Sequence, residues 1–176
     1  KLIAMFILGS LQGLLGWYMV KSGLVNNPNV SQYRLTAHLG LALFVYAYIF
    51  WMAMNLFCQK QEVEFNNAKE STNNMGVLKP LVLLLSLFVF ITIISGGFVA
   101  GLKAGHAYNT FPLMNGKLIP DGLFTLEPGW INLFENITTV QFDHRLLASL
   151  LFISLVIFYS VAIRKKMSKK LKIGLH

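Results

Sequence analysis

Two histidines, His38 and His144, are the residues of this sequence whose type and position best suit chemistry. His38 lies about one turn into a long apolar stretch, and His144 lies at the start of another. Helices through these stretches would place both side chains at similar depth. An ionisable residue inside an apolar helix commonly marks a functional site. The alternative is a histidine that is hydrogen-bonded within the helix bundle or reaches its edge, but two histidines at one depth favour a site.

The chemistry that these histidines indicate is iron ligation in a heme. Neutral imidazole binds iron, zinc or copper, but zinc needs further Cys, His, Asp or Glu ligands, and Cys58 belongs to the opposite end of the helices. A heme needs only one or two axial ligands, an apolar cleft and a cation near its propionates. Arg34 and Arg145 stand at the same boundary as the histidines. We therefore predict a membrane heme protein with His38 and His144 as metal ligands and Arg34 and Arg145 as cofactor contacts.

The elements that must position these residues are four apolar segments. The runs without Asp, Glu, Lys or Arg are Leu2–Val20, Leu35–Phe57, Pro80–Leu102 and Leu146–Ile163. Each has about the ~17–25 residues that cross a bilayer as a helix. The sequence predicts an all-α integral membrane protein whose single membrane region, 1–176, has spans at about 2–20, 35–57, 80–102 and 143–163.

Composition and charge exclude several other classes of protein. The 176 residues are 55% hydrophobic and 12% charged, which argues against a soluble globule, a disordered tail or a disulfide-stapled domain. One cysteine cannot form an internal disulfide. The net charge of +8 could indicate a nucleic-acid partner, but six of the fifteen basic residues lie in the tail 164–176, directly behind an apolar segment. We interpret the cluster as a topology signal near anionic membrane lipid, with no nucleic acid as partner.

The distribution of basic residues predicts the orientation in the membrane. Lys1, the loop 58–79 and the tail together hold ten Lys and Arg, while the segments on the other side hold five. The positive-inside rule then places the loop 58–79 and the basic C-terminal tail on the cytoplasmic or matrix side. The outer segment 103–141 is rich in Gly, Pro, Asn and apolar residues, so we expect it to fold over the outer mouth of the bundle, with a short interfacial helix near 129–136.

Two glycine series predict close helix packing. Gly9, Gly13 and Gly16 lie in the first apolar segment, and Gly97, Gly101 and Gly105 lie in and after the third, at four-residue spacing. Such small-residue faces let membrane helices approach closely. A flat macrocycle could use the same space, but plain helix packing explains the glycines equally well.

Several strings of the sequence resemble the heme A synthase family, in its alphaproteobacterial and mitochondrial branch. The matching blocks are 11–24, 30–40, 97–105, 108–116, 133–136 and 140–145, and they include Val140-Gln-Phe-Asp-His-Arg145. Their order and combination are more specific than any single motif. Lys103 departs from the family, in which relatives often carry an aspartate.

The resemblance implies a fold and an activity. Family members have eight helices in two similar, pseudo-symmetric four-helix bundles, so the chain resembles helices three to six. The implied activity is oxidation of a methyl group of heme O, the substrate, to the formyl group of heme A for cytochrome oxidase. Heme B would serve as the electron-transfer cofactor. In this resemblance His144 corresponds to a heme B ligand and His38 to a ligand in the substrate-binding bundle, so the two would not share one iron.

The resemblance also implies where the protein works and with what. We expect the bacterial inner membrane or the mitochondrial inner membrane, with heme O synthase and cytochrome oxidase assembly proteins as partners. The chain starts at Lys1 rather than Met, and its last residues resemble the start of a further apolar segment. We therefore expect a fragment that is inactive alone. It would lack the second ligand of each heme and the catalytic glutamate of the family. The alternatives are a non-enzymatic heme-binding or oxidase-assembly membrane protein and a structural four-helix subunit.

Overall fold

The computed structural model describes residues 1–21, 29–59 and 78–164, and these residues form helices joined by turns. The four long helices are α1 (Leu2–Lys21), α2 (Gln32–Gln59), α4 (Leu78–Gly101) and α6 (Ile137–Arg164). Shorter elements are η2 (Ala104–His106), η3 (Gly129–Ile131) and α5 (Asn132–Glu135). No β-strand forms within these ranges, where Met114 and Lys117 make an isolated bridge. The all-α prediction is confirmed.

All four long helices are long and apolar enough to cross a membrane. A helix rises about 1.5 Å per residue, so the 28 residues of α2 and of α6 exceed the hydrocarbon thickness of about 30 Å. The helices also extend past the predicted spans at several ends. For example, α6 begins at Ile137, ahead of the predicted start at 143. The prediction of an integral membrane protein with four transmembrane helices is confirmed.

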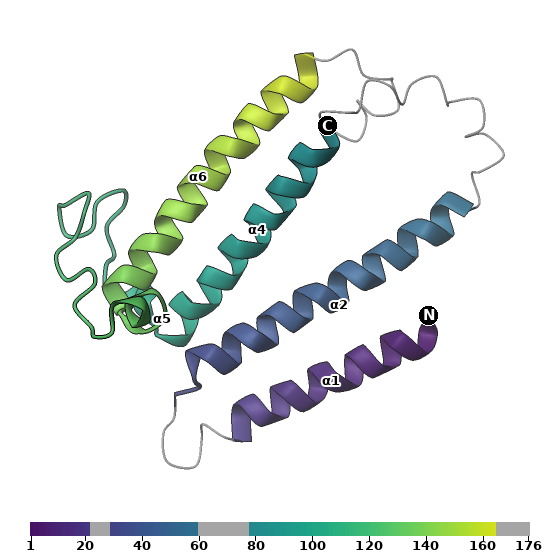
Figure 1. Ribbon diagram of the computed structural model, residues 1–176, viewed down its shortest axis with the longest axis horizontal. Helices are drawn as coiled ribbons and strands as arrows, with labels where there is room; N and C mark the ends of the chain where they lie inside the picture. Colours follow the sequence, from purple (N-terminus) through teal and green to yellow (C-terminus); the bar gives the residue numbers. More distant parts are fainter. Residues whose placement is uncertain (22–28, 60–77, 165–176) are drawn as a thin grey trace.

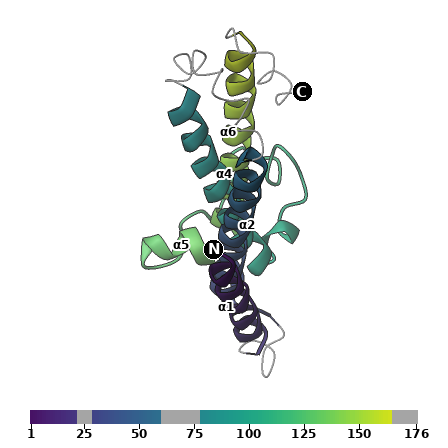
Figure 2. The ribbon, with the colours of Figure 1, turned by 90° about the vertical axis from the view of Figure 1, so that its right-hand side faces the viewer.

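The helices lie side by side in one layer, in chain order (Figure 1). Seen from the side, the layer is narrow (Figure 2). α1 has no buried residue, and large apolar side chains such as Leu83 on α4 and Phe152 on α6 are exposed. In water such a surface would be strongly unfavourable, whereas lipid or further apolar helices would solvate it.

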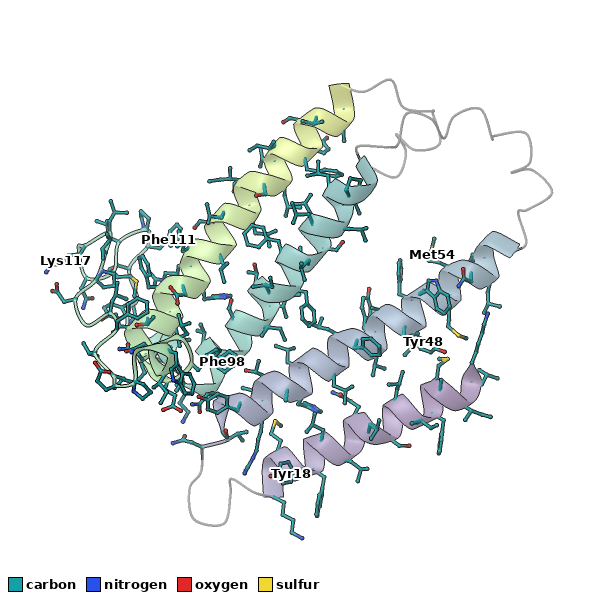
Figure 3. All side chains as sticks on the ribbon, viewed as in Figure 1. Tyr18, Tyr48, Met54, Phe98, Phe111 and Lys117 are labelled. Carbon is teal, nitrogen blue, oxygen red and sulfur yellow. The ribbon has the colours of Figure 1, made fainter. Side chains whose placement is uncertain are left out.

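Residues 102–136, here named the cap, gather at one end of the layer. The C-terminal ends of α1 and α4 and the N-terminal ends of α2 and α6 lie at this end, which we call the capped end (Figure 1). The cap contacts α6 and α4 rather than spreading evenly over all four helices. Figure 3 shows Phe98 of α4 at the capped end, and Phe111 and Lys117 out on the cap.

Two glycines bring α2 and α4 together at the capped end. A Cβ on Gly97 would lie 2.8 Å from Oγ1 of Thr36, and one on Gly101 would overlap the backbone of Gln32. Away from the capped end the two helices diverge (Figure 1). The predicted packing face is therefore confirmed at these two positions. Gly105 lies in η2, where a Cβ would meet nothing within 4 Å.

The predicted loop 58–79 and the basic tail 164–176 lie mostly outside the described residues. The side chain of Cys58 lies outside them as well.

Candidate heme-ligand histidines

His38 sits in the second turn of α2 and packs against α1. A Cβ on Gly16 of α1 would lie 3.0 Å from Cε1 of His38, and 3.6 Å from each ring nitrogen. The ring is thus seated where α1 has no side chain, which only glycine allows at this distance. This contact accounts for one glycine of the series in α1. A Cβ on Gly9 or Gly13 would meet nothing within 4 Å among the described residues.

Gln12, one turn before Gly16 on α1, holds His38 from the side. Its Nε2 donates to the His38 carbonyl oxygen at 3.1 Å and lies 3.2 Å from Nδ1 and 3.3 Å from Nε2 of the ring. Its Oε1 is buried with no hydrogen-bond partner among the described residues. A buried amide oxygen without a partner costs free energy, so Gln12 keeps an unused acceptor within the described residues, while the atom beside the His38 ring nitrogens is its donor Nε2.

His144 lies in the third turn of α6 and packs against α4 in the same manner. A Cβ on Gly96 would lie 3.1 Å from Cε1 of His144 and 3.7 Å from each ring nitrogen. Oγ of Ser95 lies 2.8 Å from Nδ1 of the ring. Each histidine therefore sits on a glycine of the preceding long helix, at the α1–α2 interface for His38 and the α4–α6 interface for His144.

The two arginines lie at the capped end but engage different partners. The guanidinium carbon of Arg34 is 4.8 Å from the ring centroid of Tyr18 on α1, a cation–π contact. Arg145 donates through Nη1 to the carbonyl of Thr110 at 2.6 Å and through Nη2 to that of Tyr108 at 2.7 Å. A guanidinium has five N–H donors, so these two bonds leave Arg145 with further donors for a carboxylate.

The cap is held by hydrogen bonds to buried asparagines. Asn132 is 0% exposed and bonds to the N–H and the carbonyl of Leu126 and to the carbonyl of Gly129. Asn136 donates to the carbonyl of Gly122 and accepts from the N–H of Thr139, so it is the N-cap of α6. Asp143 lies in the second turn of α6 and is not its N-cap, because the helix begins at Ile137.

An aromatic cluster joins the cap to α2 and α4. Tyr33 of α2 donates to Oε1 of Glu135 at 2.8 Å, and its ring centroid is 5.8 Å from that of Phe98. Phe98 in turn lies 5.2 Å from Phe134. These contacts fix α5 beside the point where α2 and α4 approach. The predicted short helix near 129–136 is therefore present as η3 and α5, while its place at a membrane interface stays a prediction.

The arrangement suits two separate heme ligands better than one shared centre. Within the described ranges, no three His, Cys, Asp or Glu side chains come together. Each imidazole lies in its own apolar helix pair and rests in a hollow that a Cβ would fill. A neutral imidazole between apolar helices is a suitable axial ligand for heme iron. His106 is exposed in η2, outside the long helices that carry these two histidines.

Sequence reasoning placed the histidines but missed the side chains that hold them. Gln12, Ser95 and Gly96 were not singled out, although a Ser-Gly pair inside an apolar helix is a signal of helix contact or function. The roles of Arg34, Arg145, His38 and His144 toward a cofactor remain predictions.

These features define a class, the multi-span helical membrane proteins with histidines in the bilayer-crossing segments. Residues 1–175 match the model of the family described as cytochrome oxidase assembly protein. The chain belongs to this family.

Curated relatives are consistent with that membership. The chain is 55% identical over 159 residues to a protein named heme A synthase from Nitrosospira multiformis, covering 90% of the chain and 43% of the relative. It is 49% identical over 176 residues to a heme A synthase from Nitrosomonas eutropha, covering 100% and 48%. A third, from Parvibaculum lavamentivorans, is 47% identical over 156 residues, covering 89% and 42%. The chain thus spans less than half the length of these relatives, and no solved structure matches it.

Proposed function

We propose that the chain is part of a heme A synthase, a membrane oxidoreductase that converts a methyl group of heme O to the formyl group of heme A. The observation that carries the proposal is the pair of histidines seated on glycines at two separate helix interfaces, in a chain whose relatives bear that name. The whole protein would have eight helices in two bundles, with the chain supplying the last two helices of one and the first two of the other.

The residues divide between a cofactor and a substrate. In this proposal His144 holds heme B and His38 holds the iron of heme O, with the second ligand of each outside the chain. Heme B, when bound, supplies one-electron transfer. Arg34 and Arg145 would pair with propionate carboxylates at the capped end, because guanidinium groups bind carboxylates with two parallel hydrogen bonds. Both histidines are half-buried within the described residues.

The membrane and the partners are part of the same proposal. The chain would reside in a bacterial inner membrane or the mitochondrial inner membrane, with 58–79 and the C-terminal tail on the cytoplasmic or matrix side. Heme O synthase would deliver the substrate, and cytochrome oxidase assembly proteins would receive the product.

The proposal is tested by heme extraction and chromatography of membranes that contain the full-length protein and a heme O synthase. We expect heme A with the wild type, and heme O without heme A with His38→Ala or His144→Ala. Full-length wild type that accumulates heme O but makes no heme A would contradict the synthase activity.

The second candidate is a non-enzymatic heme carrier or oxidase-assembly protein, which the description of the family favours. A fold and its ligands do not by themselves establish turnover. For a carrier, the protein would bind heme, but the same experiment would yield no heme A.

A further inference from the structure

We propose that Ser95 is a positioning residue that fixes the tautomer of His144, so that the lone pair available to a heme iron is on Nε2. The inference rests on the proposed function in one respect, namely that His144 ligates a heme. It concerns how α4 prepares a ligand that α6 carries, and it applies to His144 and not to His38.

The first step is the direction of the hydrogen bonds around Ser95. Its Oγ lies 2.7 Å from the carbonyl oxygen of Thr92, one turn earlier on α4, and 2.8 Å from Nδ1 of His144. A carbonyl oxygen only accepts, and a serine hydroxyl has a single proton. The hydroxyl therefore donates to Thr92, and Oγ accepts the proton of Nδ1. The Thr92 carbonyl is itself a second acceptor beside the His144 ring. The reverse arrangement would set lone pairs of the serine and carbonyl oxygens against each other at 2.7 Å.

The second step is the state of the ring. With the proton on Nδ1, the lone pair of neutral imidazole is on Nε2, the nitrogen left to bind a metal. Gly96 completes the arrangement because Cε1, which lies between the two nitrogens, rests where a Cβ would be only 3.1 Å away. Ser95 and Gly96 are adjacent on α4, so one turn of the helix sets both the tautomer and the position of the ring.

His38 has a different partner, which makes the inference specific. The group beside its ring nitrogens is the Gln12 amide nitrogen, at 3.2 and 3.3 Å. An amide N–H is a donor, so it cannot accept a proton from Nδ1 as Ser95 Oγ does. The prepared tautomer therefore belongs to the site proposed for the resident cofactor rather than to the site proposed for the substrate.

A ligand whose Nδ1–H donates to an acceptor is more basic, and it stabilises ferric over ferrous iron. The test is a redox titration of the heme B bound to purified full-length protein, followed by its optical spectrum. Ser95→Ala should raise the midpoint potential and lower heme retention by about tenfold. Ser95→Thr keeps a hydroxyl and should restore both values. Ser95→Cys keeps the size with a weaker acceptor, and it should shift the potential in the same direction by less.

Ser86→Ala is the matched control, because Ser86 lies on the same helix, is exposed, and donates only to the Val82 carbonyl at 2.8 Å. A potential in Ser95→Ala equal to that in Ser86→Ala would overturn the inference, as would a heme B spectrum unchanged by His144→Ala. If Ser95→Ala does not fold, equal potentials in Ser95→Cys and Ser95→Thr would overturn it. The proposed activity can fail while this inference holds. In that case the protein would bind heme B with a potential that depends on Ser95, but it would make no heme A.

Discussion

At the scale of single residues, the glycines under the histidines determine whether the rings reach their positions. Gly16→Val would place a Cβ 3.0 Å from Cε1 of His38, and Gly96→Val would place one 3.1 Å from Cε1 of His144. The two methyl groups of valine need further space, so each ring would be displaced from its ligand geometry. We expect each substitution to lower heme retention by about tenfold in purified full-length protein, since positioning contacts contribute on that order to metal affinity.

The matched control is Gly9→Val on α1, where a Cβ meets nothing within 4 Å among the described residues. Its heme content should equal that of the wild type. Equal heme loss in Gly9→Val and Gly16→Val would mean that valine disturbs α1 as a helix, and that the seat for His38 has no separate role.

The sequence singled out the two histidines because an ionisable residue in an apolar segment is visible without coordinates. Ser95, Gly96 and Gln12 could not be predicted in the same way. Small and polar residues recur along membrane helices, and only the contact between helices shows which of them meets an imidazole. The family resemblance separated His38 from His144, and the structure is consistent with that separation because each lies at its own interface.

At the scale of elements, the cap is held by Asn136, the residue directly before α6, which is both the N-cap of that helix and a hydrogen-bond partner of the cap. Asn136→Ala removes the N-cap and the bonds from Asn136 to Gly122 and Asn132. Loss of an N-cap alone costs roughly 0.5–2 kcal/mol. We expect faster hydrogen–deuterium exchange in 122–140, with exchange in α1 unchanged.

An exposed neighbour provides the control for that measurement. Ile137→Ala changes the first residue of α6, whose side chain is 45% exposed, and leaves the Asn136 bonds in place. Its exchange in 122–140 should stay close to that of the wild type. Unchanged exchange in Asn136→Ala would contradict the role given to the asparagine.

The cap was the least predictable element. Its apolar and turn-forming residues indicated a folded segment, and a short helix near 129–136 was expected. Its position against α6 and α4 was not, because that position depends on buried hydrogen bonds of Asn132 and Asn136 and on the carbonyls that Arg145 holds. Such polar contacts leave no periodic pattern in a sequence.

At the scale of the whole molecule, the asymmetry of basic residues predicts which face of the membrane the cap occupies. Ten Lys and Arg on one side against five on the other should keep the basic tail in the cytoplasm or matrix. In intact bacterial cells, a membrane-impermeant maleimide should label His106→Cys, and it should label Lys166→Cys only after permeabilisation. Cys58→Ser in both variants removes the native thiol. The opposite labelling pattern would invert the orientation.

The central claim is that His38 and His144 serve two separate heme sites, and counting hemes by type tests it most directly. Purified full-length protein, loaded with heme B and heme O, is compared with His38→Ala and His144→Ala by extraction and chromatography. We expect His144→Ala to lose heme B and retain heme O, and His38→Ala to lose heme O and retain heme B. Loss of both hemes together in each variant, or of neither, would contradict two separate sites.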